Sequence, residues 1–121
     1  MYKVHADTTR NRLYITLAGF LSLDEAKNCG DEAIAATRKL KIGYDVITDI
    51  TDFKPGTQEV AKDIERVQLH FKNSGARRGV RIVGQNAPSS MQFSRTGKAA
   101  GFNAVNVPTL AEAEKMLTAP D

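Results

Sequence analysis

Two carboxylates stand at the end of an apolar segment that is typical of a buried β-strand. Asp49 and Asp52 lie in the run "VITDITDF", and carboxylates at strand ends serve as metal ligands or as general acids and bases in α/β enzymes. Spaced by three on an extended chain, they point to opposite sides. No nucleophile, paired base or ligand cluster accompanies them, so we expect a protein that is not an enzyme. We predict instead that Asp49 pairs with a basic side chain such as Arg81.

The thiol and imidazole groups of the chain show no spacing that is typical of a metal or redox site. Cys29 is the single cysteine, so it has no partner for a disulfide or for a Cys-x-x-Cys motif. His5 and His70 are far apart in the sequence and match no ligand pattern. We therefore expect no metal and no other cofactor.

The segment "KPGTQE" follows the two carboxylates and precedes a helical pattern. The simplest interpretation is a Pro-Gly turn with Thr57 as the helix cap. The alternative is an anion site, because a helix start presents unpaired N–H groups and the positive end of the helix dipole. A second helix start in a neighbouring loop would add to it, and the residues of this alternative are Lys54, Gly56, Thr57, Ser89 and Ser90.

Positive charge is concentrated in the second half of the chain. Between Glu65 and Glu112 there are seven basic residues and no acidic one, and these are Arg66, Lys72, Arg77, Arg78, Arg81, Arg95 and Lys98. A one-signed face would attract an anionic ligand or acidic lipid head groups, whereas scattered cations would form an ordinary solvated surface. Phenylalanines are interleaved with these cations, but Phe71 occupies a core-facing position and the chain has no tryptophan. We therefore expect no nucleic-acid partner.

Hydrophobic periodicity divides the chain into short strands and helices. Strands are predicted over residues 2–6, 12–18 and 44–50, in "VRIVG" and in "AVNV". Helices are predicted to begin after caps at Ser22, at Thr57, at Ser89 or Ser90, and at Thr109. Gly30 weakens the first of these helices by about 1 kcal/mol relative to alanine.

Strands that alternate with helices predict an α/β domain with parallel strands after an N-terminal β-hairpin. Ligands of such sheets bind beyond the carboxyl ends of the strands, here the loops 51–57, 84–90 and 107–109. A chain of 121 residues with 41% hydrophobic side chains suits one domain, residues 1–121. No membrane-length apolar run or cleavable leader is present in the sequence, so a cytoplasmic protein is expected.

The order of these elements resembles the STAS domain, the fold of bacterial anti-sigma factor antagonists. The resemblance covers about residues 12–117 and depends on "YDVITDITDF", "NSGARRGVRIVG", "SMQFSRTGKAAGF" and "VNVPTLAEAEKML" in that order. It implies a mixed sheet with about four helices. In the family, a helix-start serine in an Asp-Ser-Ser-Gly-Leu segment is phosphorylated by a partner kinase. Here the family's register places Thr57 at the motif's aspartate and Gln58 at its serine, so the usual phospho-acceptor is missing.

The resemblance implies a regulatory domain that binds a protein partner, such as a kinase or an anti-sigma-like factor. The expected contact surface is the loop and helix around residues 53–66. An anionic ligand or a lipid at the same helix N-terminus is the alternative, and a homodimer would cover the edge of the short first strand. The expected partner-binding residues are Lys54, Gly56, Thr57, Gln58, Glu59 and Lys62.

Overall fold

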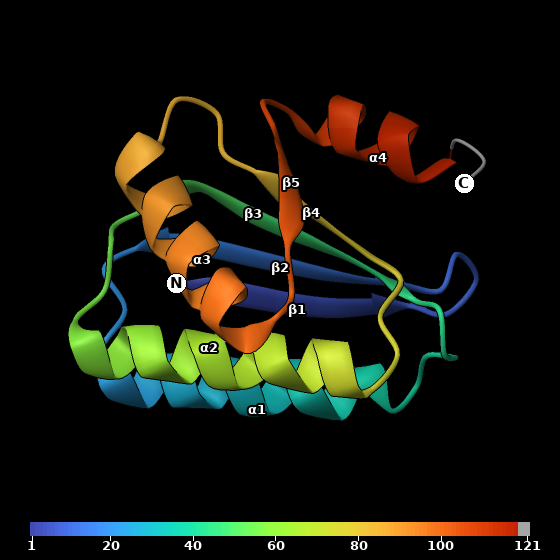
Figure 1. Cartoon of the computed structure of the whole chain (residues 1–121), viewed down its shortest axis with the longest axis horizontal. Helices are drawn as coiled ribbons and strands as arrows, with labels where there is room; N and C mark the ends of the chain where they lie inside the picture. Colours follow the sequence, from blue (N-terminus) through green and yellow to red (C-terminus); the bar gives the residue numbers. More distant parts are fainter. Residues whose placement is uncertain (119–121) are drawn as a thin grey trace.

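The chain begins with a β-hairpin and then alternates between helices and strands (Figure 1). A computed structural model describes residues 1–118. The expected α/β fold, with an N-terminal hairpin, a mixed sheet and four helices, is confirmed. The elements are β1 (Tyr2–Asp7), β2 (Arg12–Gly19), α1 (Leu23–Thr37), β3 (Asp45–Phe53), α2 (Gln58–Asn73), β4 (Arg78–Ile82), α3 (Ala87–Ala100), β5 (Ala104–Val107) and α4 (Leu110–Thr118).

The five strands form one sheet in the order β1-β2-β3-β4-β5. β1 pairs antiparallel with β2, and every later pair is parallel, as the intervening helices require. β3 lies in the middle of the sheet, which explains why its sequence is apolar and β-branched rather than alternating. The parallel arrangement places the loops after β2, β3 and β4 at one edge of the sheet.

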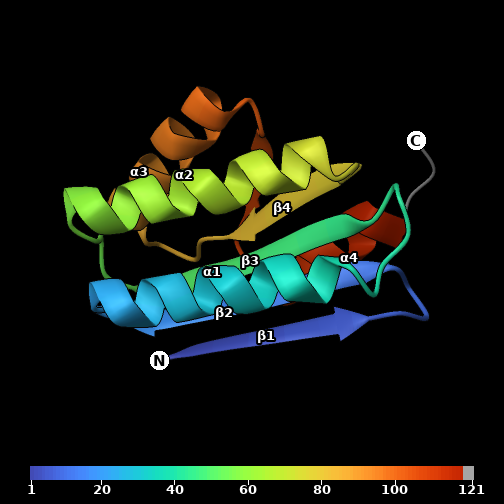
Figure 2. The same cartoon turned by 90° about the horizontal axis from the view of Figure 1, so that it is seen from below.

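Helices cover the two faces of the sheet unequally. α1, α2 and α3 lie on one face, and α4 alone lies on the other (Figures 1 and 2). The larger core cluster joins the three-helix layer to the sheet, and a smaller one lies under α4. Glu114 anchors α4, because its carboxylate accepts hydrogen bonds from Arg12 at 2.5 Å and from the Tyr14 hydroxyl at 3.0 Å. Among the described helices, none is long and apolar enough to cross a membrane.

Three of the four predicted helix caps are found in the structure. Ser22 forms a capping box with Glu25, Thr57 accepts a hydrogen bond from the Val60 N–H, and Thr109 accepts one from the Glu112 N–H.

The predicted cap of α3 is wrong. Its N-cap is Asn86, whose side chain accepts from the Ser89 N–H, and neither Ser89 nor Ser90 is the cap. Asn86 is a favourable cap residue, and Pro88 just inside the helix suits the first turn, where a backbone N–H has no partner to lose.

The predicted pair between Asp49 and Arg81 does not form. Arg81 lies opposite Thr48 in the β3–β4 ladder and shares its face of the sheet, so Asp49, one residue later, is on the other face. The Asp49 carboxylate instead accepts hydrogen bonds from the N–H and the hydroxyl of Thr51. At the start of the same strand, the buried Asp45 does pair with an arginine: Arg77 contacts it through two nitrogens at 3.2 and 2.7 Å.

The glycine in the middle of α1 allows that helix to approach α2 closely. A Cβ atom on Gly30 would lie 2.8 Å from Arg66 Nη2, 2.9 Å from Asp63 Oδ2 and 2.9 Å from Val67 Cγ2. The Val67 methyl group is stiff, because β-branched side chains have little χ1 freedom in a helix. Packing of the two helices therefore outweighs the low helix propensity of glycine at this position.

Replacing Gly30 by alanine is expected to destabilise the protein despite the better helix propensity of alanine. Overpacking costs about 1–3 kcal/mol and the propensity gain returns about 1 kcal/mol, so we expect a net loss of about 1 kcal/mol. Urea unfolding of Gly30→Ala and of the wild type measures this difference in the free energy of unfolding. Asn28→Ala, at an exposed position of α1, is the control and is expected to be neutral or stabilising. A stabilised Gly30→Ala variant would contradict this account of the helix contact.

A hydrogen bond between Thr37 and His70 also joins α1 to α2. The Thr37 hydroxyl donates to the Ile34 carbonyl at 2.7 Å, so at 2.8 Å it accepts from His70 Nε2. Burial lowers the pKa of His70 below its ordinary value, and the nearby positive charges of Arg38 and Arg66 lower it further.

This lowered pKa predicts a loss of stability in mild acid. Neutral His70 makes its full contribution to the free energy of unfolding at pH values above the unfolded pKa of about 6.5. This contribution is lost as the pH falls through 6.5 toward the lower folded pKa, because the unfolded chain then binds more protons than the folded one. Urea midpoints measured at about pH 7.5 and about pH 5.5 should differ less for His70→Gln than for the wild type. His5→Gln, at an exposed position, should keep the wild-type difference.

Candidate functional site

The loops at the carboxyl ends of β2, β3 and β4 are bonded to one another. The Lys54 N–H donates to the Gly19 carbonyl at 2.9 Å. The Asn86 side-chain amide donates to the carbonyls of Ile50, Thr51 and Phe53 at 2.9, 3.2 and 2.6 Å. The loops after β3 and β4 are therefore neighbours, as the parallel topology predicted, and Asn86 holds the end of β3 in place.

The backbone of Gly56 is held by a side chain of α3. The Gln92 carbonyl oxygen accepts from the Gly56 N–H at 2.9 Å, and the Gln92 amide donates to the Gly56 carbonyl at 2.9 Å. A Cβ atom on Gly56 would overlap Val60 Cγ1, so this position has room for glycine only. Thr57 then caps α2, as the simplest interpretation of the segment predicted.

The structure presents most of the expected partner-binding residues to solvent. Gly56 is half-buried, and the exposed members are Lys54, Thr57, Gln58, Glu59 and Lys62. Two apolar side chains that the sequence analysis missed flank them. Phe20 is 57% exposed and follows Gly19, whose carbonyl binds the Lys54 N–H, and Met91 is 63% exposed and precedes Gln92. In the sequence, the only sign of exposure at Phe20 and Met91 is that each is an isolated apolar residue next to a loop.

The groups of the alternative anion site are largely committed to bonds within the protein. The Gly56 N–H binds Gln92, and the hydroxyl of the fully buried Ser89 donates to the Phe53 carbonyl at 2.6 Å. The Ser90 hydroxyl accepts from the Asn106 amide at 2.9 Å. Lys54 is thus left without a converging set of donors, and the geometry gives the anion alternative no support.

The seven cations of the acid-free stretch do not form one face around residues 54–57. Arg66 pairs with Asp31 and Asp63, between α1 and α2. Arg77 and Arg78 lie near Asp45, at the opposite end of β3 from this loop. Arg81 is buried and Arg78 is half-buried, whereas Lys72, Arg95 and Lys98 are exposed, as are Arg66 and Arg77.

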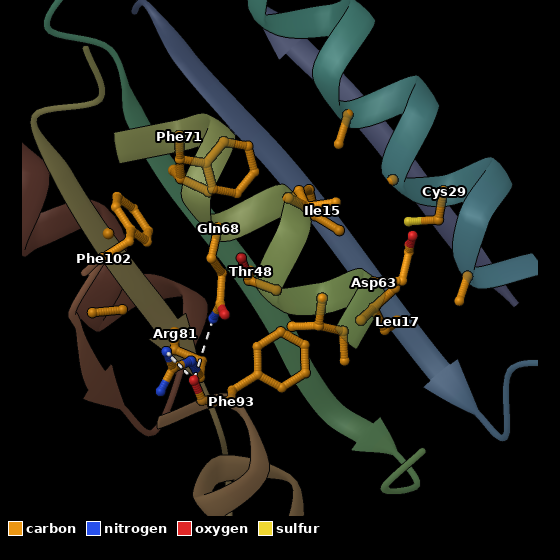
Figure 3. Close-up of a pocket in the computed structure, with 18 of the residues that line it drawn as sticks. Ile15, Leu17, Cys29, Thr48, Asp63, Gln68, Phe71, Arg81, Phe93 and Phe102 are labelled. Carbon is orange, nitrogen blue, oxygen red and sulfur yellow. Dashed lines mark hydrogen bonds between the residues drawn. The ribbon is translucent and has the colours of Figure 1, made fainter. Parts of the chain in front are cut away.

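A cavity of about 60 Å³ lies between the sheet and the three-helix layer (Figure 3). Most of its wall is apolar and comes from β2, β3 and the three helices, including Ile15, Leu17, Val67, Phe71 and Phe93. Figure 3 shows Arg81 and Gln68 at one end and Asp63 and Cys29 at the other. Burial raises the pKa of Cys29 to about 12, so its thiol is protonated and a poor nucleophile.

Arg81 places a positive charge at the polar end of this cavity. Its side chain is 3% exposed, and its guanidinium donates to Ser94 Oγ at 3.1 Å, to Asn106 Oδ1 at 3.2 Å and to the Phe93 carbonyl at 3.5 Å. All three acceptors are neutral, and no ion pair to Arg81 occurs among residues 1–118. Burial lowers the pKa of Arg81 to about 10.

Gln68 brings an unsatisfied acceptor to the same end of the cavity. Its Nε2 donates to the Phe93 carbonyl at 3.2 Å, which fixes which end of the amide faces α3. The other end, Oε1, is buried and has no hydrogen-bond partner within residues 1–118. The Thr48 side chain lines the cavity beside it, since Thr48 lies opposite Arg81 in the ladder. The sequence suggested only Asp49 as a partner for Arg81, and nothing in it indicated that Gln68 and Thr48 lie beside this arginine.

Comparison of the sequence with known protein families and with curated proteins finds no match. No group of three or more histidine, cysteine or acidic side chains suited to a metal ion occurs within residues 1–118.

Removing the Gln92 side chain is expected to loosen the loop before α2. Gln92→Ala deletes both hydrogen bonds to Gly56, so the free energy of unfolding should fall by about 1–3 kcal/mol. Amide hydrogen exchange at Gly56 should rise at least about tenfold. Gln85→Ala, in the neighbouring loop and exposed, is the control and should leave both quantities unchanged. Unaltered exchange at Gly56 would show that Gln92 does not hold the loop.

Proposed function

We propose that this protein is a non-enzymatic, STAS-like regulatory domain that binds a protein partner through the loop and helix around residues 53–66. The observation that carries the proposal is the exposed row of Lys54, Thr57, Gln58, Glu59 and Lys62, flanked by Phe20 and Met91. Mixed charges around a few apolar anchors are typical of a reversible protein interface.

The resemblance to anti-sigma factor antagonists supports the same surface. In that family the start of the equivalent helix is the contact with a partner kinase, and the order of strands and helices here agrees with the expected one. At the position of the phosphorylated serine this chain has Gln58, which cannot accept a phosphoryl group. The Thr57 hydroxyl already caps α2. We therefore propose that partner binding here is constitutive rather than switched by phosphorylation of this motif.

Charge reversal on the first turns of α2 tests the proposal. Glu59→Lys combined with Lys62→Glu keeps the net charge but exchanges the signs on the proposed surface. Cross-linking in extract of the native cell should identify the partner, and its purified form should then bind the double variant at least about tenfold more weakly than the wild type, or about 1.4 kcal/mol.

A matched reversal on the opposite face of the sheet provides the control. Glu112 and Lys115 on α4 are exposed and have the same spacing as Glu59 and Lys62. Their reversed double variant should bind the partner with wild-type affinity. Adding Phe20→Ser and Met91→Ser to the α2 double variant should weaken partner binding further, since both substitutions remove an apolar side chain from the proposed interface. Equal loss from the α2 and α4 reversals would remove residues 53–66 as the contact surface.

A further inference from the structure

The cavity beneath the three-helix layer is large enough to hold more than a single water. A water molecule needs about 10–15 Å³ of such volume, so about 60 Å³ corresponds to roughly four to six waters or to a small organic molecule. Protein interiors pack at crystal-like density and contain few voids of this size. A space of this size inside the fold has room for a bound molecule.

At one end of the cavity, Arg81 lacks a counter-ion and Gln68 lacks a hydrogen-bond donor among the described residues. The Arg81 guanidinium is buried without a carboxylate among the described residues, and a buried charge is normally paired. Gln68 is 5% exposed, and its Oε1 is a buried acceptor that receives no hydrogen bond from the part of the chain that the structure describes. Arg81 therefore needs an anion as counter-ion, and Gln68 Oε1 needs an N–H or O–H donor.

The remaining wall defines the rest of the occupant. Ile15, Leu17 and Phe71 present an apolar surface to the cavity (Figure 3), and Val67 also lines it. Asp63, at the far end, already accepts from Arg66 Nε at 2.9 Å and offers no strong site for a second cation. A single arginine balances one negative charge, so the cavity suits a monoanion rather than a phosphate dianion.

We propose that this cavity binds a short aliphatic hydroxy acid, whose carboxylate pairs with Arg81, whose hydroxyl donates to Gln68 Oε1 and whose alkyl carbons lie against the apolar wall. A planar carboxylate matches the fork of N–H groups on a guanidinium. The ligand thereby supplies Arg81 with a counter-ion and Gln68 Oε1 with a donor, and Thr48 lies within the same wall. This site is separate from the proposed partner surface and does not depend on it.

A second, smaller hollow of about 50 Å³ also borders Arg81. It is lined by Arg81, Ser94, Phe102, Asn103 and Ala104, between α3 and β5. Ser94 and Asn103 are exposed, and Phe102 is half-buried and also lines the main cavity. Arg81 therefore borders both hollows.

Titration of the whole protein with 3-hydroxybutanoate, followed by amide NMR, tests the proposal. Saturable shifts are expected at cavity residues such as Gly79 and Phe102. Butanoate, which lacks the hydroxyl, and 1,3-butanediol, which lacks the carboxylate, should each bind at least about tenfold more weakly, since each leaves one buried group unpaired. Equal affinity for the three probes, or shifts confined to exposed lysines, would overturn the proposal.

Variants of the two polar residues assign their roles separately. Arg81→Met should abolish the preference for the acid over the diol, and Gln68→Leu should abolish the preference for the hydroxy acid over butanoate. Arg95→Met, on the exposed side of α3, should bind as the wild type does. Unchanged preferences in both cavity variants would overturn the assignment.

Gln68→Glu is a second variant that tests the proposed site if Arg81→Met does not fold. The new carboxylate would supply Arg81 with a counter-ion from within the protein, so this variant should unfold at a higher temperature than Gln68→Leu and should bind no hydroxy acid. Binding of 3-hydroxybutanoate by folded Gln68→Glu with wild-type affinity would place the ligand elsewhere and refute the proposal.

Discussion

Burial of the Arg81 charge in an interior strand is the constraint around which α2, α3 and β5 are arranged. The carbonyl of Phe93 on α3 is the shared acceptor: Gln68 reaches it at 3.2 Å, Thr96 at 3.1 Å and Arg81 at 3.5 Å. Such a carbonyl gains from a nearby cation, and the Phe93 ring adds a cation–π contact with Arg81 at 5.5 Å. α2, α3 and β4 are thereby tied together by polar contacts in an otherwise apolar layer.

Small residues make this arrangement sterically possible. A Cβ on Gly97 would lie 2.6 Å from the Phe102 carbonyl and 3.3 Å from Gln68 Nε2. A Cβ on Gly79 would lie 2.8 Å from the Phe102 ring, so that glycine lets Phe102 reach the sheet and contact Phe71. Gly97 and Gly79 thus allow Phe102 to pack between α3 and the sheet, and the cavity is the space that the surrounding side chains leave unfilled.

The local elements were predictable from the sequence because each depends on neighbours in the chain. The caps at Ser22 and Thr57 follow from residue type and a spacing of three, and the parallel topology follows from helix-length connections. The Asp49–Arg81 pair failed for a different reason. Face assignment depends on the register between strands, and a shift of one residue moves a side chain across the sheet.

The site residues that escaped sequence analysis are those whose role is created by tertiary contact. Nothing in the sequence indicates that Gln92 binds both backbone groups of Gly56. The same is true of the Asn86 amide, which donates to three carbonyls of β3, and of Gln68, which lies near Arg81. Their polar side chains are typical of exposed helix and loop positions. Only the packing of α2 and α3 against the sheet gives them partners.

α2 belongs to both proposed sites, and its geometry explains how one helix serves two surfaces. Its first turns expose Gln58, Glu59 and Lys62 to solvent, whereas Val60 and Val67 line the cavity on the buried side. A period of 3.6 residues separates these faces without any change in backbone. Val60 also lies against Gly56, which Gln92 ties to α3. The position of the exposed turn is therefore set by the same α2–α3 packing that shapes the cavity.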